Sequence, residues 1–271
     1  MSTASAPLEI GRVALTVNDL AAVRDFYRTA LGLEVLRGDE GVALLGAGDR
    51  AILELREDRS ARRRSAREAG LFHTAFLLPS RDALGRWLRH AAESRLPLQG
   101  ASDHLVSEAV YLADPEGNGI EVYADKPREA WPREGGEIKM DTLPMDVNGV
   151  AGSADGPWTG APEGTVVGHV HLQVGNVAEA EEFYHGALGF DVMTHYPGAA
   201  FLGSGGYHHH LGANVWNSRG AGRRTYPSTG LADVEILADG SAMDALLTRT
   251  GGQRHLADPW GTSVTLNAKA A

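Results

Sequence analysis

Two stretches of the chain, VNDLAAVRDFYRTALGLEV (17–35) and VGNVAEAEEFYHGALGFDV (174–192), are near copies of each other. The letters FY and ALG recur in both at an offset of 157 residues, with no gap between them. A match of this length at a fixed offset indicates an internal duplication. The fold must therefore be built from a repeated unit.

A fainter second pair of stretches completes the pattern. GLFHTAFLL (70–78) corresponds to GLADVEIL (230–237), and DPEGNGIEV (114–122) corresponds to DPWGTSVTL (258–266). The sequence therefore predicts four related units, at 8–57, 69–125, 165–217 and 228–268.

Each unit is predicted to form one strand, one helix and three further strands. The alternating stretch RVALTV (12–17) predicts a first strand. Leu20, Val23 and Tyr27 then recur at helical spacing and form one apolar stripe. Gly32 is placed to end this helix, and short apolar runs bounded by glycine follow as strands. The predicted fold class is α+β, with four β-α-β-β-β modules.

The segment 127–164 separates the second unit from the third. It is rich in glycine and proline and has weak periodicity, so we expect a long, partly mobile connection. Trp131 and Trp158 are expected to pin it to the body of the protein. The predicted domains are 8–126 and 165–271, with 127–164 as the linker.

The composition restricts the possible functions. The chain has 271 residues, a net charge of −10 and no cysteine. The negative charge argues against a nucleic-acid partner, and the lack of cysteine excludes disulfides and thiolate metal ligands. No apolar run reaches the roughly 18 residues of a membrane span, and the first residues lack the features of a signal peptide, so we expect no membrane partner and a cytoplasmic location. The basic run Arg62, Arg63, Arg64 and Arg67 is expected to form a solvated surface.

The four units resemble the vicinal oxygen chelate (glyoxalase/bleomycin resistance/dioxygenase) superfamily. The longer motifs DHLVSEAVYLADPEGNGIEVYADKPREAWP and GGYHHHLGANVW resemble its catechol-2,3-dioxygenase-like members with two glyoxalase-type domains. The shorter ALGLEV and DPEGNG motifs occur throughout the superfamily, including metal-free binding proteins, so they indicate the fold rather than the chemistry. The resemblance implies that units join edge to edge into two curved, cup-like mixed sheets. It also implies metal ligands on the first strand of each paired unit and on the last strand of one.

The residues at these ligand positions differ between the units. The first-strand position holds Arg12, His73, His169 and Asp233, and the last-strand position holds Glu121 in the second unit and Thr265 in the fourth. Pairing the second unit with the third brings together His73, His169 and Glu121. Two imidazoles and one carboxylate are the facial ligand set of non-haem iron(II) sites, which leaves three positions open on the metal. The resemblance therefore implies a metal site between these two units.

Each ligand also has an alternative interpretation. His73 taken alone fits a core histidine that is hydrogen-bonded to the backbone. His171 shares the strand face of His169 and is either an alternate ligand or a group behind the ligands. A lone carboxylate at Glu121, in the apolar strand GIEVY, is costly to bury without a partner, which favours the metal interpretation.

Three consecutive histidines, His208, His209 and His210, lie in a predicted strand, where successive side chains alternate between faces. The resemblance to extradiol dioxygenases implies that His209 faces the metal pocket as an acid–base residue, while its neighbours point away or flank the site. A surface histidine cluster or an adventitious metal patch is the alternative. The resemblance also implies that His104 and Tyr111 lie over the substrate hydroxyls, and Tyr111 equally fits a packed core tyrosine.

The implied function is extradiol cleavage of catechol or a substituted catechol with O2 at an iron(II) site, with Mn(II) as the alternative metal. A glyoxalase-like lyase or isomerase is the first rival, but that chemistry prefers four protein ligands, commonly with two carboxylates. A metal-free binding or resistance protein is the second rival, and it has no need for His73, His169 and Glu121 together. Sheet edges exposed in this fold are often covered by a partner, so a homo-oligomer is compatible with the sequence.

Overall fold

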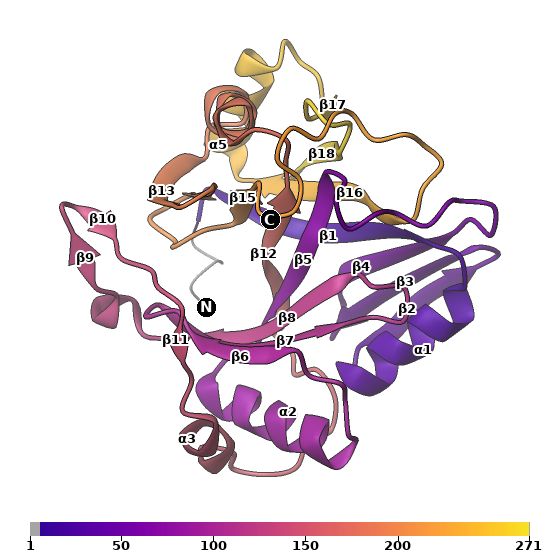
Figure 1. Cartoon of the computed structure of the whole chain (residues 1–271), viewed down its shortest axis with the longest axis vertical. Coiled ribbons are helices and arrows are strands. Elements are labelled where there is room, and N and C mark those ends of the chain that lie inside the picture. The colour runs from indigo at the N-terminus through magenta and orange to yellow at the C-terminus, as the bar shows by residue number, and fades with distance from the viewer. Residues whose placement is uncertain (1–5, 271) are drawn as a thin grey trace.

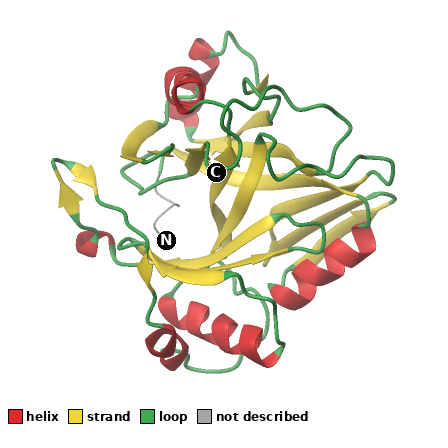
Figure 2. Cartoon of the chain, in the orientation of Figure 1, coloured by secondary structure: helices red, strands yellow, loops and turns green. Residues whose placement is uncertain are grey.

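The computed structural model describes residues 6–270, which form two large mixed sheets with helices at their outer sides (Figures 1 and 2). The smaller sheet has seven strands, in the order β17 (His255–Ala257), β18 (Ser263–Ala268), β16 (Gly230–Ala238), β1 (Leu8–Val17), β4 (Arg50–Glu57), β3 (Val42–Ala47) and β2 (Glu34–Asp39). The larger sheet has nine, in the order β11 (Leu143–Pro144), β6 (Gly100–Asp103), β7 (Ser107–Ala113), β8 (Gly119–Asp125), β5 (Gly70–Leu77), β12 (Val166–Gln173), β15 (Leu211–Asn214), β14 (Ala199–Gly203) and β13 (Asp191–Tyr196). One sheet curls into a half-barrel, and the fold class is α+β, which confirms the prediction.

Each sheet combines strands from both halves of the sequence. In the smaller sheet β1 runs antiparallel to β16, which joins the first unit to the fourth. In the larger sheet β5 runs antiparallel to β12, which joins the second unit to the third. Within the described residues, the fourth unit has only two strands, β17 and β18, after its helix, instead of the three expected.

The helices begin at capping residues and bury an apolar stripe. They are α1 (Leu20–Ala30), α2 (Arg81–Glu93), α3 (Val147–Gly152), α4 (Val177–Glu181), which continues into the π-helical turn η2 (Glu182–Ala187), and α5 (Gly240–Arg249). The Asp19 side chain caps α1 by accepting a hydrogen bond from Ala22 N, and the helix buries Val23 and Tyr27. Gly32 follows the helix with φ +67°, a conformation that favours glycine. None of the helices in the described part of the chain is long and apolar enough to span a membrane.

The connection 127–164 contains regular elements of its own. It includes the 3-10 turn η1 (Arg128–Ala130), a hairpin of β9 (Arg133–Glu134) and β10 (Glu137–Ile138), and then β11 and α3. Strand β11 extends the edge of the larger sheet beside β6, and α3 packs against α2. Trp131 is buried with Ile138 and Tyr207, while Trp158 packs against the main core. The two tryptophans therefore hold both ends of the segment against the body, as expected.

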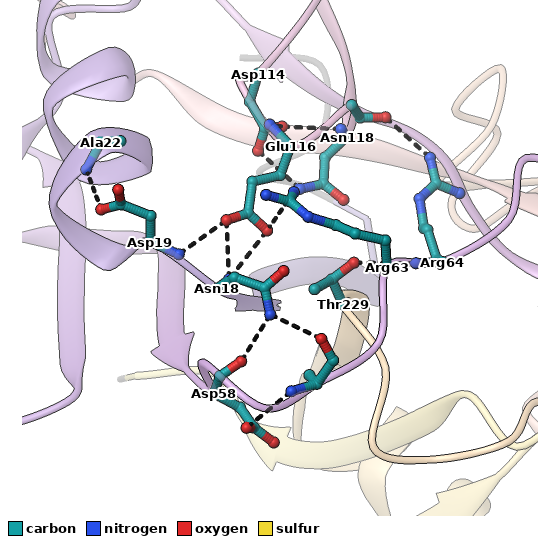
Figure 3. A network of polar contacts seen from close by, with 12 residues as sticks. Asn18, Asp19, Ala22, Asp58, Arg63, Arg64, Asp114, Glu116, Asn118 and Thr229 are labelled. Atoms are coloured by element: carbon teal, nitrogen blue, oxygen red, sulfur yellow. Dashed lines mark hydrogen bonds and ion pairs between the residues drawn. The ribbon is translucent and has the colours of Figure 1, made fainter.

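A polar network ties the loop before β8 to the start of α1 (Figure 3). The Glu116 carboxylate accepts hydrogen bonds from the backbone N–H of Asn18 (2.8 Å) and Asp19 (2.9 Å), and it pairs with Arg63 at 3.0 Å. The Glu116 side chain is only 2% exposed. This loop therefore connects the second unit to the first, although the two units lie in different sheets.

The basic run at 62–67 takes part in the same polar network. The expectation that it forms a solvated surface is therefore wrong for part of it. The half-buried Arg64 donates hydrogen bonds to the carbonyl oxygens of Leu71 (2.7 Å) and Gly117 (3.0 Å). Arg62 pairs with Glu68 at 2.8 Å. These arginines close the gap between two loops, and their positive charge is satisfied within the chain.

Candidate metal centre

Three buried side chains on three neighbouring strands converge on one point. His73 lies on β5, Glu121 on β8 and His169 on β12, and their exposed fractions are 7%, 2% and 2%. The Glu121 Oε2 atom is 3.0 Å from His73 Nε2 and 3.4 Å from His169 Nε2. The two Nε2 atoms are 3.3 Å apart. The three side chains form a group that could hold a metal ion.

These distances match one face of an octahedron. Ligand atoms bonded to a metal at about 2.0–2.2 Å, at right angles to one another, lie about 3 Å apart. All three ligand atoms here are at about that separation from both others, so they are mutually adjacent rather than opposed. A metal held by such a face keeps its three remaining positions free for other molecules. The residues present therefore fit a non-haem iron or manganese ion.

Strand pairing brings the three residues together. Glu121 lies opposite Ala75 in the parallel pair β5–β8, so it is next to the position two residues beyond His73. Strand β12 pairs with the other side of β5, with a register shift on each side of the segment His169–His171. Such bulges redirect side chains and are common beside active sites.

Burial and mutual contact keep Glu121 negatively charged and His169 uncharged. Burial raises the pKa of Glu121, but the imidazoles of His169 and His73 outweigh it and hold that pKa well below its usual value. Burial lowers the pKa of His169 to about 4, against the opposing effect of Glu121. Metal binding requires a carboxylate and neutral imidazoles. Glu121 and His169 therefore have the charge states that binding of a cation requires.

His171 lies beside this group without belonging to it. Its ring is 5.0 Å from that of His73, centre to centre, and edge-on to Phe72 at 5.2 Å. Its Nε2 atom is buried and has no hydrogen-bond partner among the described residues. The ring lies flat on the backbone of Gly212, where an added Cβ would come within 2.7 Å of His171 Cδ2. His171, the alternative ligand in the sequence interpretation, therefore lines the cavity and packs against Gly212.

His104 and Tyr111 form a hydrogen-bonded pair next to the carboxylate. Tyr111 on β7 is directly opposite Glu121 on β8, and its hydroxyl is bonded to His104 Nε2. The other ring nitrogen, His104 Nδ1, is 2.8 Å from the carbonyl oxygen of Asp141. Because a carbonyl only accepts, Nδ1 donates and Nε2 accepts the proton of Tyr111. Burial and then Glu121 raise the pKa of Tyr111 well above 10, so the phenol keeps that proton.

The three consecutive histidines do not lie in a strand, so this expectation is wrong. Strand β14 ends at Gly203 and β15 begins at Leu211, and residues 204–210 form a turn between them. His208, His209 and His210 are all buried, at 0%, 8% and 0% exposure. Strand alternation therefore does not decide where they point, and the surface-cluster alternative does not fit their burial.

The turn nevertheless brings His209 to the metal group. Its ring centre is 4.1 Å from that of His169, and it lies edge-on to Phe201 at 4.9 Å. Burial lowers the pKa of His209 well below 6.5, and the neighbouring His169 lowers it further. His210 points elsewhere, since its Nδ1 accepts a hydrogen bond from Ser204 N at 3.2 Å.

A cavity of about 200 Å³ opens above the three candidate ligands. All the predicted site residues line it, namely His73, His104, Tyr111, Glu121, His169 and His209. Aromatic residues form much of the remaining wall, including Phe72, Tyr196, Phe201 and Trp216. The sequence interpretation missed Met140, Asp141 and Thr142, which come from the connection 127–164. The tryptophan at position 131 was the available sequence signal that this segment packs against the body.

The matching positions in the smaller sheet hold residues with polar or charged partners nearby. Arg12 Nε is 3.1 Å from Glu54 Oε2. Asp233 accepts hydrogen bonds from Ser263 Oγ at 2.6 Å and Thr265 Oγ1 at 3.0 Å. In the described chain the group of potential metal ligands lies in the larger sheet.

Paired βαβββ units, two mixed sheets and a buried two-histidine, one-carboxylate group define a glyoxalase- or dioxygenase-type protein. The family model of the Glyoxalase/Bleomycin resistance protein/Dioxygenase superfamily matches residues 9–122 and 166–262. The chain belongs to this superfamily, which confirms the resemblance seen in the sequence.

Two characterised relatives are similar in sequence. The chain is 42% identical over 228 residues to the catechol-2,3-dioxygenase of Bacillus subtilis (strain 168), covering 82% of this chain and 80% of the relative. It is 28% identical over 165 residues to biphenyl-2,3-diol 1,2-dioxygenase 3 of Rhodococcus globerulus, covering 57% of this chain and 84% of that protein.

Solved structures share the fold at low sequence identity. A Bacillus subtilis protein aligns with a TM-score of 0.65 at 12% identity, covering 97% of this chain and 86% of that one. Glyoxalase I of Zea mays aligns with a TM-score of 0.55 at 18% identity, covering 96% of this chain and 92% of that one. At these identities the likeness concerns the fold alone.

Proposed function

We propose that this protein is an extradiol dioxygenase, which opens the ring of catechol or a substituted catechol with O2 at a non-haem iron(II) site. The observation that carries the proposal is the separation of about 3 Å among His73 Nε2, Glu121 Oε2 and His169 Nε2. A facial set of this kind has room for both oxygens of a diol and for O2. The similarity to a catechol-2,3-dioxygenase points to the same chemistry.

The proposed ligands are His73, His169 and Glu121, with iron(II) as the metal and Mn(II) as the alternative. When bound by these residues, the metal would supply a Lewis acid for the diol and the redox chemistry with O2. The protein contributes position, proton transfer and shelter from water. Glu121 supplies the one negative charge of the ligand set, so the diol does not face a second protein anion among these ligands.

The remaining roles go to three residues around the cavity. His209 is proposed to accept and return protons at the substrate and O2, as a general acid–base group. The hydroxyl of Tyr111, fixed as a donor to His104, leaves its oxygen free to accept a hydrogen bond from a substrate hydroxyl. The aromatic wall of Phe72, Phe201 and Trp216 suits the flat face of a ring.

The glyoxalase-like lyase is less well supported. That chemistry prefers four protein ligands, commonly with two carboxylates, so it would need a carboxylate in addition to Glu121. The β15 residue that corresponds to Glu121 is Gly212, because Gly212 pairs with His171 as Glu121 pairs with Ala75. Glycine has no side chain to offer, and the ring of His171 fills the space above it.

Anaerobic reconstitution tests the proposal. Purified protein is loaded with Fe(II) or Mn(II) without air, the bound metal is counted, and catechol and then air are added. We expect one metal per chain, one O2 consumed per catechol, and a yellow ring-opened product. Stoichiometric metal without O2 consumption across catechol, alkylcatechols and 2,3-dihydroxybiphenyl would contradict the proposal.

Other expectations stay predictions from the sequence. These are the absence of nucleic-acid and membrane partners, a cytoplasmic location, and a homo-oligomer formed through exposed sheet edges.

A further inference from the structure

His209 stands at the inner end of a chain of buried hydrogen bonds that leads away from the cavity. Its Nδ1 atom is 2.8 Å from Nδ1 of His208. The other nitrogen of His208, Nε2, is 2.9 Å from Oδ1 of Asp125, at the end of β8. His208 is fully buried, and it lies edge-on to Trp131 at 5.1 Å and against the tilted ring of Tyr207 at 4.1 Å, centre to centre. Its orientation is therefore set by packing as well as by hydrogen bonds.

A second arm of the chain fixes the direction in which protons are donated. Tyr207 donates its hydroxyl proton to Asp125 Oδ1 at 3.2 Å, and the Tyr123 hydroxyl is 2.8 Å from that of Tyr207. Burial and then Asp125 raise the pKa of Tyr207 well above 10, which keeps the phenol a donor. Since Tyr207 gives its proton to Asp125, Tyr123 must give its own to Tyr207.

The backbone makes room for this arm beside a candidate metal ligand. An added Cβ at Gly168 would lie 1.8 Å from the Tyr123 hydroxyl oxygen. Any other residue before His169 would therefore displace the tyrosine. The network is built into the fold on both sides of the candidate site.

One arrangement of protons satisfies the chain when both imidazoles are neutral. The Asp125 oxygen accepts, so the proton of His208 is on Nε2. The lone pair of His208 is then on Nδ1, and it can only accept from His209. The single ring proton of His209 is therefore on Nδ1, which leaves Nε2 with its lone pair.

We propose that Asp125 and His208 are positioning residues that hold His209 in the tautomer with a bare Nε2 atom toward the cavity. This inference rests on the proposed function for the identity of the proton donor, which is a hydroxyl of the bound diol. On transfer the hydroxyl O–H bond breaks and an N–H bond forms at His209 Nε2. The imidazolium so formed keeps its Nδ1 proton in the hydrogen bond to His208. It can return the Nε2 proton later without rotation of the ring.

Histidine tautomers are measured directly by nitrogen NMR, without any turnover. Full-length protein with 15N-labelled histidine is studied metal-free and with Zn2+ as a diamagnetic metal, and signals are assigned by single substitutions at His208 and His209. We expect the Nε2–H tautomer for His208 and the Nδ1–H tautomer for His209 in both forms. Asp125→Asn offers an N–H as well as an oxygen, so His208 should shift toward a mixture of tautomers.

Two NMR results would overturn the inference: an Nε2–H tautomer at His209, or an imidazolium at His208. Both can be observed whether or not the protein cleaves diols. If the tautomers are as expected and no diol is cleaved, the proposed function fails and the tautomer assignment stands.

Kinetics of the iron-loaded enzyme give an independent test. His208→Leu removes the acceptor for His209, and we expect kcat to fall about 10- to 100-fold at nearly unchanged KM, as for other residues that orient a site group. His208→Asn puts an amide oxygen near the place of Nδ1 and should recover part of the loss. His210→Leu is the matched control, a buried histidine of the same turn outside this chain, and it should change stability but not kcat. Equal kcat for wild type, His208→Leu and His208→Asn would overturn the inference.

Discussion

The two sheets are built from related units, yet only the larger one carries a group suited to a metal among the described residues. The strand registers make the comparison residue by residue. His171 faces His73 across the centre of the larger sheet, and Ala14 faces Asp233 across the centre of the smaller one. By this correspondence Arg12 takes the place of His169. In the parallel pair β5–β8, Glu121 lies next to Ala75, and in the parallel pair β16–β18, Thr265 lies next to Glu235. Thr265 therefore takes the place of Glu121.

Where the larger sheet has a candidate metal site, the smaller sheet has a cationic side chain, Arg12. The Arg12 guanidinium pairs with Glu54, which also binds Arg56 at 2.6 Å. Asp233 is satisfied by two hydroxyl groups. In the larger sheet, Glu121 contacts two imidazoles that bring no full charge when neutral. The difference teaches that the same fold can place either a paired protein cation or a candidate group of metal ligands at equivalent positions.

Removing the Glu121 carboxylate should abolish the expected difference in metal binding between the two sheets. Glu121→Ala leaves two neutral imidazoles, a much weaker site for a hard divalent ion. We expect metal content and O2 consumption to fall to background, with losses of at least about 100-fold. Thr265→Ala, at the matching position of the smaller sheet, is the control and should keep both. Full iron occupancy and normal turnover in Glu121→Ala would sink the assignment.

Removing the acid–base group should separate metal binding from chemistry. His209→Phe keeps the aromatic contact with Phe201 but has no nitrogen for proton transfer. We expect normal iron content, near-normal binding of catechol, and a kcat about 10² to 10⁴ lower. Iron analysis and oxygen-electrode kinetics on the same samples check this. A fully active His209→Phe enzyme would remove this turn from the mechanism.

Two substitutions should give the smaller sheet a metal site that resembles the candidate site of the larger sheet. Arg12→His together with Thr265→Glu removes the built-in cation and supplies an imidazole and a carboxylate beside Asp233. We expect a second metal equivalent per chain, bound more weakly than the first because the surroundings are not shaped for it. Titration with Zn2+ followed by calorimetry measures the stoichiometry. Arg12→Lys with Thr265→Glu retains a cation there and should still bind one equivalent.

The loops before β8 and β18 also differ between the two sheets, and here the expected effect of a substitution is smaller. Glu116 accepts hydrogen bonds from backbone N–H groups just before α1, whereas the matching Trp260 is packed in the apolar core. Glu116→Gln loses the ion pair with Arg63 and weakens a buried acceptor, so the free energy of unfolding should fall by about 1–3 kcal/mol. Glu129→Gln, on an exposed turn, should change it little. Urea unfolding of the metal-free proteins measures both.

The buried histidines of the larger sheet should give the metal-free protein a pH-dependent stability. An unfolded histidine takes up a proton near pH 6.5, but burial delays this for His169 to about pH 4. The unfolded state therefore binds more protons between these values, and the free energy of unfolding should fall as the pH drops from about 6.5 to about 4. The slope is at most about 1.4 kcal/mol per pH unit for each such histidine.

Urea unfolding at pH 7, 6 and 5 checks this slope. Burial also lowers the pKa of His171, so His171→Asn should reduce the slope by the share of one histidine. His255→Asn, on an exposed strand of the smaller sheet, is the control. Stability independent of pH over this range would contradict the burial argument.

The duplicated stretches allowed the fold class to be predicted, because a strand followed by a helix and further strands recurs in all four units. The uneven distribution of His73, His169, Glu121 and Arg12 gave the reason to pair the inner units, and the strand order has that pairing. Both inferences needed only local patterns and residue identity.

Other features depend on contacts between residues distant in sequence, which local patterns do not reveal. The sequence predicts a strand at His208–His210 because the mostly apolar stretch LGANVW follows, but the His208 ring has Asp125 as its partner and the residues form a turn. The pairing of Arg12 with Glu54 and the approach of Met140 to the cavity are likewise set by tertiary packing.

The second unit pairs with the third, and the first unit pairs with the fourth. This order of pairing affects how the protein folds during its synthesis. All strands of the larger sheet are complete once residue 214 has been made, whereas β1 must wait for β16, which begins at Gly230. Domains fold as their sequence becomes available during synthesis. We therefore expect the metal-binding half to assemble first, with β1 exposed as an unpaired edge that chaperones can recognise. Protease protection of stalled nascent chains would reveal this order, and equal protection of both sheets only at full length would refute it.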